Sequence, residues 1–354
     1  MDKLILDNIV FSLQKAGGIS VVWQEILKEI LCQKDLNFEC LEYFGTESNI
    51  FRESLSIPEK NIKLLSGPIA LKRFISPKVK IDEPTIFHSS YYRTIRDKHV
   101  KNVTTVHDFT YELSTRGFKR KLHTWQKYKA IYGSESVVCI SKNTVKDLKF
   151  YCPGIEEDKI RIIYNGVSED YHPLSENEHR DLKNSVLFVG MRGGHKNFQL
   201  TVEALSDTKY NLIICGSPLS EEEKAFLNNK LGEERYFYEG RVSNEELNIL
   251  YNSVCCLAYP SSYEGFGIPV LEAQRARCPV IALNASSIPE VMGAKKFLMN
   301  SPSTEEFIKC LSTLENKKVR EDIIEEGLEF SQKFSWEKMA KEYMDLYQEI
   351  SQKK

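Results

Sequence analysis

The chain alternates short apolar runs with longer stretches in which apolar residues recur at helical spacing. Most of the short runs are continuously apolar and rich in β-branched residues, which is typical of parallel strands covered on both faces. The predicted strands are KLILDNIVF, FECLEYF, TIFH, VTTVH, SVVCIS and KIRIIYN in the first half, and SVLFVG, NLIICG, RYFYEG, VCCLAYP, PVIALN and KFLM in the second. Helical patterns lie between them, for example over 19–31, 142–150, 243–252 and 269–277. This alternation predicts an α/β protein with doubly wound sheets.

The alternation is interrupted at residues 165–173, NGVSEDYHP, and restarts after them. This stretch is rich in glycine, proline and polar residues, and a chain of 354 residues is longer than one typical core supports. We therefore predict two Rossmann-like domains that face each other across a cleft. The first covers residues 1–168 and the second residues 169–335.

Charge divides unevenly between the two halves. Residues 1–165 contain 26 Lys and Arg against 20 Asp and Glu, whereas the remainder contains 22 against 30. The basic half predicts an anionic partner for the first domain, with a chance imbalance between two solvated surfaces as the alternative. Nucleic acid is not the expected partner, because the net charge is only −2 and the chain carries no recognised nucleic-acid-binding motif.

The nine cysteines are scattered and lack CxxC spacing, which indicates reduced thiols rather than disulfides or a zinc site. The N-terminal apolar run is too short for a signal peptide, and no run reaches the length of a membrane-spanning helix. We expect a cytoplasmic protein.

In doubly wound sheets, ligands bind beyond the carboxyl ends of the strands. Gly17 and Gly18 follow the first predicted strand and precede a helix, where the backbone and the helix N-terminus favour an anion. A tight turn without a ligand is the alternative for this pair. His107 closes the strand VTTVH, and here a structural histidine is the alternative to a site residue.

The segment LFVGMRGGHKNF ends a strand at Gly190 and then supplies Arg192 and Lys196. A planar arginine fork and a mobile lysine charge together neutralise a diphosphate, and a solvated basic turn is the alternative. The spacing is not that of a Walker loop. Since the chain contains no D-x-D triplet, we expect fixed cations rather than a metal ion to hold the diphosphate.

The stretch YEGFGIPVLE carries Glu264 and Glu272, eight positions apart. Carboxylates accept hydrogen bonds from vicinal hydroxyls, so one could hold a sugar and the other a ribose. Between them, the amides of residues 265–268 are placed to bind phosphate at the start of a helix. Because Pro269 suits the first turn of a helix, Glu272 could instead be an acid that interacts with the helix dipole.

Together these residues resemble the retaining GT-B glycosyltransferases of family four. Supporting stretches are CISKNTVKDL, IYNGVS, EGRVSNEEL, YPSSYEGFGIPVLEAQRARCPVIA and SSIPEVMG, and the resemblance spans nearly the whole chain. It implies the GT-B fold, in which a C-terminal helix, here within residues 336–354, crosses back onto the first domain. It also implies an enzyme that takes a nucleotide-diphosphate sugar as donor and needs no cofactor.

The resemblance further implies roles for individual residues. Glu264 would bind the transferred sugar, Glu272 the ribose, and Arg192 with Lys196 the diphosphate. His107 would lie at the transferred sugar, so the expected catalytic residues are His107, Glu264, Lys196 and Arg192. The expected donor-binding residues, with Arg241 and Val242 in the wall around the base, are Gly17, Gly18, Gly190, Arg241, Val242, Gly265, Phe266, Gly267 and Glu272.

The acceptor is expected to meet the first domain. Tyr91, Tyr92 and Arg93 follow the strand TIFH and, with Asp108, are predicted to line its pocket. Residues 116–129 carry six Lys or Arg and no acid, and apolar residues recur at helical spacing in this region at Phe118, Leu122, Trp125 and Tyr132. Such a helix could lie on the anionic inner face of the cytoplasmic membrane, or it could pack its apolar stripe into the domain.

The family retains the anomeric configuration, and no carboxylate here stands in the position expected for a nucleophile. A front-face reaction is therefore expected, in which the leaving phosphate accepts the proton of the acceptor. The predicted reaction moves a hexose to a glycan or lipid-linked saccharide in bacterial surface polysaccharide synthesis, with GDP-mannose favoured as donor and a UDP-sugar close behind. The alternatives are a GT-B nucleotide-sugar epimerase, a phosphorylase-like enzyme, and an inactive scaffold that binds a nucleotide sugar.

Overall fold

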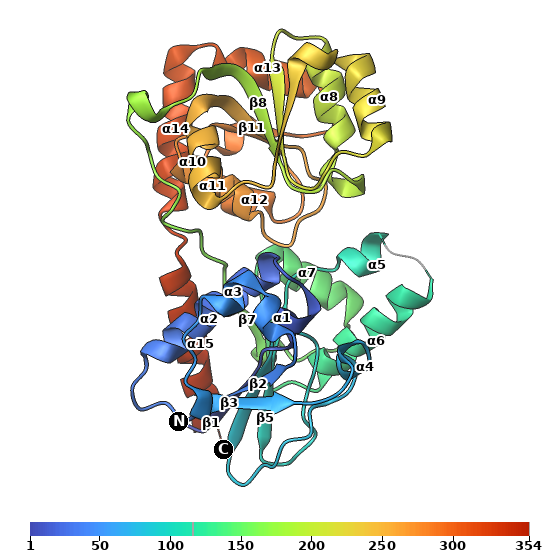
Figure 1. Cartoon of the computed structure of the whole chain (residues 1–354), viewed down its shortest axis with the longest axis vertical. Helices are drawn as coiled ribbons and strands as arrows, with labels where there is room; N and C mark the ends of the chain where they lie inside the picture. The colour runs from blue at the N-terminus through green and yellow to red at the C-terminus, as the bar shows by residue number, and fades with distance from the viewer. Residues whose placement is uncertain (115–116, 354) are drawn as a thin grey trace. The chain divides into compact units, whose positions relative to one another are not determined.

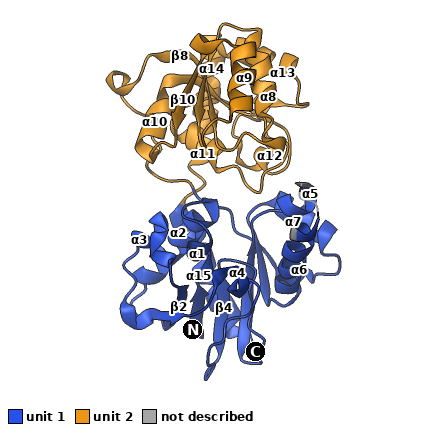
Figure 2. Ribbon diagram, turned by 45° about the vertical axis from the view of Figure 1, so that its right-hand side comes forward, with its two compact units in different colours: residues 1–166, 336–354 blue, residues 167–335 orange. Residues whose placement is uncertain are grey.

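The computed structural model describes residues 1–114 and 117–353. The chain divides into two compact units (Figure 2): unit 1 holds residues 1–166 and 336–354, and unit 2 holds residues 167–335. Each unit is built on one parallel sheet with helices packed against it. The predicted α/β class with two Rossmann-like domains is therefore confirmed.

Unit 1 has a seven-stranded sheet in the order β3-β2-β1-β4-β5-β6-β7, and its paired neighbours run parallel. The strands are β1 Lys3–Asp7, β2 Phe38–Tyr43, β3 Ile62–Leu65, β4 Thr85–Ser89, β5 Val100–Val106, β6 Ser136–Cys139 and β7 Ile160–Ile162. The helices are α1 Ile9–Leu13, α2 Gly18–Cys32, α3 Ile50–Glu53, α4 Ile69–Lys72, α5 Thr110–Ser114, α6 Phe118–Tyr132, α7 Lys142–Tyr151 and α15 Trp336–Gln352. The strand order reverses at the β1–β4 pair, the kind of switch point at which such sheets bind ligands.

The last helix, α15, packs against α2 of unit 1 (Figure 1). Its residues Met339, Tyr343 and Tyr347 are buried in one apolar cluster with Leu4 of β1 and Ile26 of α2. Apolar residues at helical spacing give α15 one face that requires burial, and unit 1 supplies the matching surface. The expected return of the C-terminal helix to the N-terminal region is therefore confirmed.

Unit 2 has a six-stranded parallel sheet in the order β10-β9-β8-β11-β12-β13. The strands are β8 Leu182–Val189, β9 Asn211–Cys215, β10 Tyr236–Gly240, β11 Val254–Tyr259, β12 Val280–Leu283 and β13 Leu298–Met299. The helices are α8 Phe198–Ser206, α9 Glu221–Lys230, α10 Asn244–Ser253, α11 Ile268–Arg275, α12 Ile288–Val291, α13 Thr304–Leu314 and α14 Lys317–Ser331. The switch point lies between β8 and β11, which makes the segments after these two strands neighbours at the carboxyl edge.

The first apolar run, KLILDNIVF, is not one strand as predicted. Strand β1 ends at Asp7, and helix α1 begins at Ile9. The residue between them, Asn8, is buried, and its side chain donates to Glu42 Oε1 at 2.8 Å and accepts from Trp23 Nε1 at 2.8 Å. A buried amide with two side-chain partners holds the turn inside an otherwise apolar run.

Candidate functional site

Three loops at the carboxyl edge of the unit 2 sheet are tied to one another by hydrogen bonds. The loop after β11 donates from Ser262 N to His195 O at 2.8 Å, and Asn197 Nδ2 donates to Pro260 O at 2.8 Å. On the other side, Ser286 after β12 donates from Oγ to Glu264 O at 2.6 Å and accepts from Glu264 N at 3.1 Å. The loops after β8, β11 and β12 therefore form one connected frame, which restricts the positions of the side chains they carry.

Within this frame, Lys196 and Glu264 form an ion pair, although they lie far apart in the sequence. Lys196 Nζ is 2.6 Å from Glu264 Oε1, and the side chains are 16% and 12% exposed. Lys196 Nζ also lies 5.3 Å from the ring centroid of Tyr259, at the end of β11. Burial and then the charge of Glu264 raise the pKa of Tyr259, so this phenol stays protonated. Two residues that the sequence singled out thus meet at the switch point of the sheet.

Arg192 comes from the same loop as Lys196 but has a different partner. Its Nε is 2.8 Å from Glu223 Oε1, and its Nη2 donates to Pro218 O at 2.8 Å. The hydrogen bond from Arg192 lowers the pKa of Glu223. Among the described residues, Arg192 Nη1 is buried without a hydrogen-bond partner. The two cations predicted to act together are thus held by two separate carboxylates, and a joint role on a diphosphate stays a prediction.

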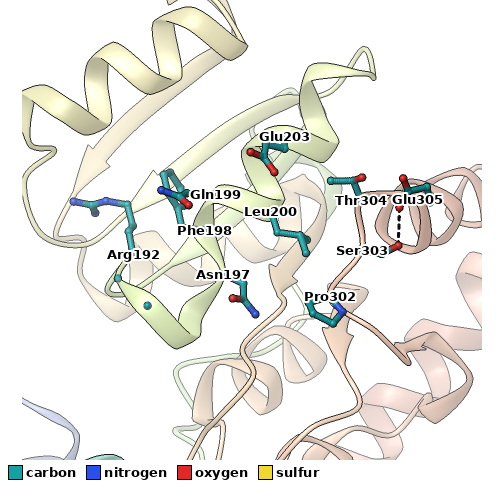
Figure 3. Close-up of a pocket in the computed structure, with 12 residues that line it drawn as sticks. Arg192, Asn197, Phe198, Gln199, Leu200, Glu203, Pro302, Ser303, Thr304 and Glu305 are labelled. Atoms are coloured by element: carbon teal, nitrogen blue, oxygen red, sulfur yellow. Dashed lines mark hydrogen bonds between the residues drawn. The ribbon is translucent and has the colours of Figure 1, made fainter. Parts of the chain in front are cut away.

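Beside Arg192 lies a pocket of about 730 Å³ between α8 and the start of α13. Figure 3 shows Arg192 at one end of it, opposite Ser303 and Thr304, with Asn197 on the rim between them. Gly193 and Gly194 also line this pocket.

Glu272 lies in the second turn of α11, because that helix begins at Ile268. Pro269 lies in the first turn as expected, and the alternative that Glu272 interacts with the helix dipole near the helix start stays a prediction. Glu272 Oε2 accepts a hydrogen bond from Tyr251 OH at 3.1 Å. Burial raises the pKa of Glu272 to about 7, although the hydrogen bonds from Tyr251 and Tyr171 lower this pKa in part. The predicted contact between Glu272 and a ribose is not tested by this geometry.

The turn before α11 depends on glycine. Gly267 has φ +109°, and a Cβ there would lie 3.2 Å from Val291 Cγ2. The preceding Phe266 is 3% exposed, and its carbonyl accepts from Ser287 Oγ at 2.8 Å. The segment 265–267 is thus held at the start of α11, where backbone amides favour an anion.

Glycine stands at the carboxyl ends of three neighbouring strands of unit 2, because Gly190 follows β8, Gly216 follows β9 and Gly240 ends β10. Gly190 N donates to Cys215 O at 2.9 Å, and Gly216 N donates to Gly240 O at 2.7 Å. Gly216 has φ +144°, and a Cβ there would lie only 2.6 Å from Gly190 O. Sequence reasoning selected Gly190 but missed Gly216, which the strand-ending glycine in NLIICG could have indicated. Arg241 and Val242 directly follow Gly240 at this edge.

In unit 1, Gly17 and Gly18 stand at the N-terminus of α2. A Cβ on Gly17 would lie 2.6 Å from Gln14 Oε1, whereas Gly18 has open space around it. The Gln14 carbonyl accepts from Asn49 Nδ2 at 2.7 Å, which holds this loop in place. The arrangement allows a ligand to approach the backbone at Gly18.

His107 and Asp108 follow β5, as predicted. Burial lowers the pKa of His107 to about 4, so the imidazole is neutral at pH 7. Asp108 Oδ1 accepts from Thr110 N at 2.8 Å at the start of α5, and the Asp108 carbonyl accepts from Lys127 Nζ at 2.9 Å. These contacts give Asp108 a structural task in addition to the predicted place at the acceptor.

Arg93 is enclosed in unit 1. Its Nε donates to Asp7 Oδ2 at 2.7 Å and its Nη1 to Tyr43 OH at 2.8 Å, and its side chain is 1% exposed. This ion pair accounts for the burial of Arg93 and leaves little surface for an acceptor. The expected contact between Arg93 and the acceptor stays a prediction that these contacts do not support.

Tyr91 and Tyr92 belong to an aromatic cluster that the sequence did not reveal. His123 of α6 stacks on Tyr111, with ring centroids 3.9 Å apart, and meets Tyr92 edge-on at 5.5 Å. Burial lowers the pKa of His123 to about 4, and its Nδ1 is buried without a hydrogen-bond partner among the described residues. The only sequence signal for His123 was its position inside the basic segment, so it was not selected.

Helix α6 leaves three of the four residues of its predicted apolar stripe exposed, whereas Leu122 is half-buried. Phe118, Trp125 and Tyr132 are 78%, 53% and 51% exposed, so packing of the stripe into the domain is wrong for these three aromatic residues. Arg116, the first residue of the predicted basic segment, lies outside the described residues.

Two observations bear on metals and membranes. In the part of the chain that the structure describes, three or more His, Cys, Asp or Glu side chains do not gather in a way that could hold a metal ion. Over the same residues, none of the helices combines the length and the apolar character needed to cross a membrane.

Two family models match the chain, one for most of each unit. The model described as Glycosyltransferase Family 4 matches residues 30–171, and that described as Glycosyl transferases group 1 matches residues 174–330. An uncharacterized glycosyltransferase of Methanocaldococcus jannaschii is 25% identical, with 99% of each chain covered. The O-antigen chain mannosyltransferase B of Escherichia coli is 30% identical over 46% of this chain and 45% of its own length. The second similarity thus covers less than half of that mannosyltransferase.

A solved structure shares the architecture over the whole chain. HepE of Anabaena, in complex with UDP and glucose, superposes with a TM-score of 0.73 at 14% identity, covering 99% of this chain and 100% of that one. At this identity the likeness establishes the fold.

Proposed function

Because this chain belongs to the family four, group 1 glycosyl transferases, we propose that it moves a hexose from a nucleotide-diphosphate sugar to a glycan or lipid-linked saccharide. The products would be surface polysaccharides such as O-antigen or capsule. The mannosyltransferases of O-antigen synthesis among its relatives support this acceptor class.

The pair formed by Lys196 and Glu264 carries the proposal. A sugar diphosphate presents hydroxyls beside anionic phosphate oxygens. The carboxylate can bind the hydroxyls and the ammonium group can bind the phosphate oxygens, so both groups can replace their contact with each other by contacts with the ligand. When the donor binds, Lys196 turns its charge to the diphosphate and Glu264 accepts hydrogen bonds from the hydroxyls of the sugar. Because the two groups are 2.6 Å apart, one ligand can reach both of them.

The proposed reaction retains configuration and proceeds on one face without a metal ion. The bond between the anomeric carbon and the phosphate oxygen breaks, and the hydroxyl oxygen of the acceptor bonds to that carbon on the same face. The leaving phosphate oxygen takes the hydroxyl proton. Lys196 stabilises the charge on the leaving diphosphate, and Arg192 adds to this once it releases Glu223. His107, with a pKa of about 4, acts as a neutral hydrogen-bonding group beside the sugar.

GDP-mannose is the favoured donor, and a UDP-sugar is the second choice. The O-antigen mannosyltransferases among the relatives favour mannose, whereas the neighbour solved with UDP and glucose favours a uridine nucleotide. The acceptor is proposed to be presented at the inner face of the cytoplasmic membrane, where a lipid-linked saccharide is anchored.

A ligand panel tests the donor site. The melting temperature of the full chain is measured with GDP, UDP, GDP-mannose and UDP-glucose, and the true donor raises it by mass action. The same panel on Lys196→Ala should show a smaller shift for the nucleotide diphosphates. Product analysis with the best donor then separates transfer to an acceptor from epimerisation. The proposal fails if none of the four ligands raises the melting temperature.

A further inference from the structure

Helix α6 of unit 1 is turned so that its large aromatic residues face solvent. Phe118, Trp125 and Tyr132 recur every seven residues, which puts them on one face of a helix. Their exposed fractions are 78%, 53% and 51%. Large aromatic residues that are exposed together on one face, rather than scattered over the surface, indicate a site that binds a partner molecule or a membrane.

The opposite face of α6 explains why the helix folds this way. Lys127 Nζ is 2.8 Å from Glu112 Oε2, with both side chains at most 1% exposed. Gln126 Nε2 donates to Tyr92 O at 3.0 Å, and His123 packs among the tyrosines of unit 1. Polar residues with fixed partners therefore anchor α6. Within the stripe, Tyr132 OH also donates to Pro153 O at 3.1 Å, which leaves Phe118 and Trp125 as the rings most exposed for another contact.

Segments that neighbour α6 carry further exposed apolar residues. Trp125 and Lys129 line a small cavity together with Phe74, which follows α4. Leu71 and Ile75, from the same stretch as Phe74, are 62% and 50% exposed. Helix α5 packs against α6 (Figure 1), and its Leu113 is 53% exposed. We call the exposed face of α6 formed by Phe118, Trp125 and Tyr132 the aromatic face.

The charges around the aromatic face have one sign. Residues 117–132 contain five Lys or Arg and no acid, and of the five Lys127 is buried, in its pair with Glu112 on the opposite face of α6. Arg120 and Lys121 are exposed, and Lys129 Nζ lies 5.2 Å from the centroid of the Trp125 ring. Lysine and arginine side chains keep their charge at the edge of an apolar surface while their stems cover it. A second copy of the same face would bring like charges together, which disfavours self-association.

We propose that the aromatic face docks unit 1 onto an anionic lipid bilayer. Aromatic rings enter the boundary between headgroups and acyl chains, and the flanking cations pair with anionic lipid. This inference rests on the proposed function in one respect, because a lipid-linked acceptor makes a membrane the place of reaction. Docking itself requires neither donor nor acceptor, so it can be measured separately from transfer.

Co-sedimentation of the full chain with vesicles tests the proposal. We expect binding to phosphatidylcholine vesicles that contain about one third phosphatidylglycerol, and weak binding to pure phosphatidylcholine. Phe118→Ser and Trp125→Ser should each lower the partition coefficient roughly tenfold, because each removes a ring from the buried contact. The matched control is Phe44→Ser, which removes a ring of similar exposure, 75%, elsewhere on unit 1.

Each outcome decides the proposal. Loss of binding in both α6 variants with normal binding of Phe44→Ser supports it, provided that all variants keep the wild-type melting temperature. Failure of the wild-type chain to bind the anionic vesicles overturns it, as does equal binding by the α6 variants. A wild-type dimer that Trp125→Ser converts to a monomer would assign the face to a second copy of this chain instead. Transfer to a soluble saccharide with vesicle binding absent would leave the enzymatic proposal intact and sink only this one.

Discussion

Both units place an ion pair at the switch point of their sheet, yet the two pairs differ in access to solvent. In unit 1, Asp7 ends β1 and Arg93 follows the neighbouring β4. In unit 2, Lys196 follows β8 and Glu264 follows the neighbouring β11. The first pair is at most 1% exposed, whereas the side chains of the second are 16% and 12% exposed.

The surroundings explain the difference. Arg93 spreads its donors over Asp7, Tyr43 and the carbonyl of Lys72, so the pair is part of the interior. Lys196 has one carboxylate partner, Glu264, and a ring beside it. A pair enclosed by further hydrogen bonds stabilises a unit, whereas a pair at the surface of a frame of loops can exchange its partner for a ligand. The same topological position thus serves structure in one unit and, as we propose, chemistry in the other.

The largest expected effect is on the stability of unit 1. Arg93→Met leaves the carboxylate of Asp7 buried without its partner, which should cost about 3–5 kcal/mol of unfolding free energy. Lys196→Met should cost less, because Glu264 is more accessible to water than Asp7 is. Urea denaturation of the two variants checks this contrast. Equal losses would show that the two pairs play the same role.

Catalysis should show the reverse order. Lys196→Ala should lower kcat roughly 10²- to 10³-fold, because a fixed cation at the leaving diphosphate is removed. Lys209→Ala is the matched control in unit 2, since that side chain is 72% exposed and pairs only at the surface. Steady-state kinetics with the donor identified by the ligand panel provide the measurement. Near-normal turnover in Lys196→Ala would contradict the assigned role.

A smaller effect concerns the pH dependence of unit 2. Burial raises the pKa of Glu272 from 4.5 to about 7, so the folded state holds this proton more tightly than the unfolded chain does. The stabilisation is fully present below about pH 4.5 and is lost as the pH rises through about 7. Glu272→Gln cannot lose the proton and should therefore gain melting temperature relative to the wild type as the pH rises. Parallel pH profiles of the two proteins would refute the shift.

The smallest expected effect tests whether Arg192 can change partners. Glu223→Gln removes the carboxylate charge but keeps an acceptor for the start of α9, where Glu223 completes a capping box with Ser220. If Arg192 moves to the diphosphate, its release should tighten binding of the nucleotide diphosphate roughly two- to fivefold. Calorimetric titration gives this number. Unchanged or weaker binding would keep Arg192 a structural partner of Glu223.

Unit 2 was the more predictable of the two units. Each of its six strands overlaps a predicted apolar run, because most of them are buried parallel strands, which leave a continuous signal in the sequence. The edge strand β10 is the exception in burial, since Phe237 and Tyr238 are exposed. In unit 1, β3 was missed, since this edge strand has only four residues and its Leu64 is 53% exposed. Strand β1 was predicted too long, because the buried Asn8 that ends it finds its partners Glu42 and Trp23 only in the folded chain.

The sequence by itself determined the class of fold, the family and the loops that carry the candidate site residues. This is because the spacing of apolar residues and the motifs at strand ends are local properties of the chain. Only the tertiary structure decided which charges meet. Lys196 pairs with Glu264, Arg192 with Glu223, and Arg93 with Asp7. The orientation of α6 about its axis likewise depends on partners elsewhere in unit 1. The buried ion pair between Lys127 and Glu112 places Trp125, on the opposite face of the helix, in solvent. The physical reason is that a charged side chain gains most from a partner in a buried setting, and that partner is brought to it by packing rather than by sequence spacing.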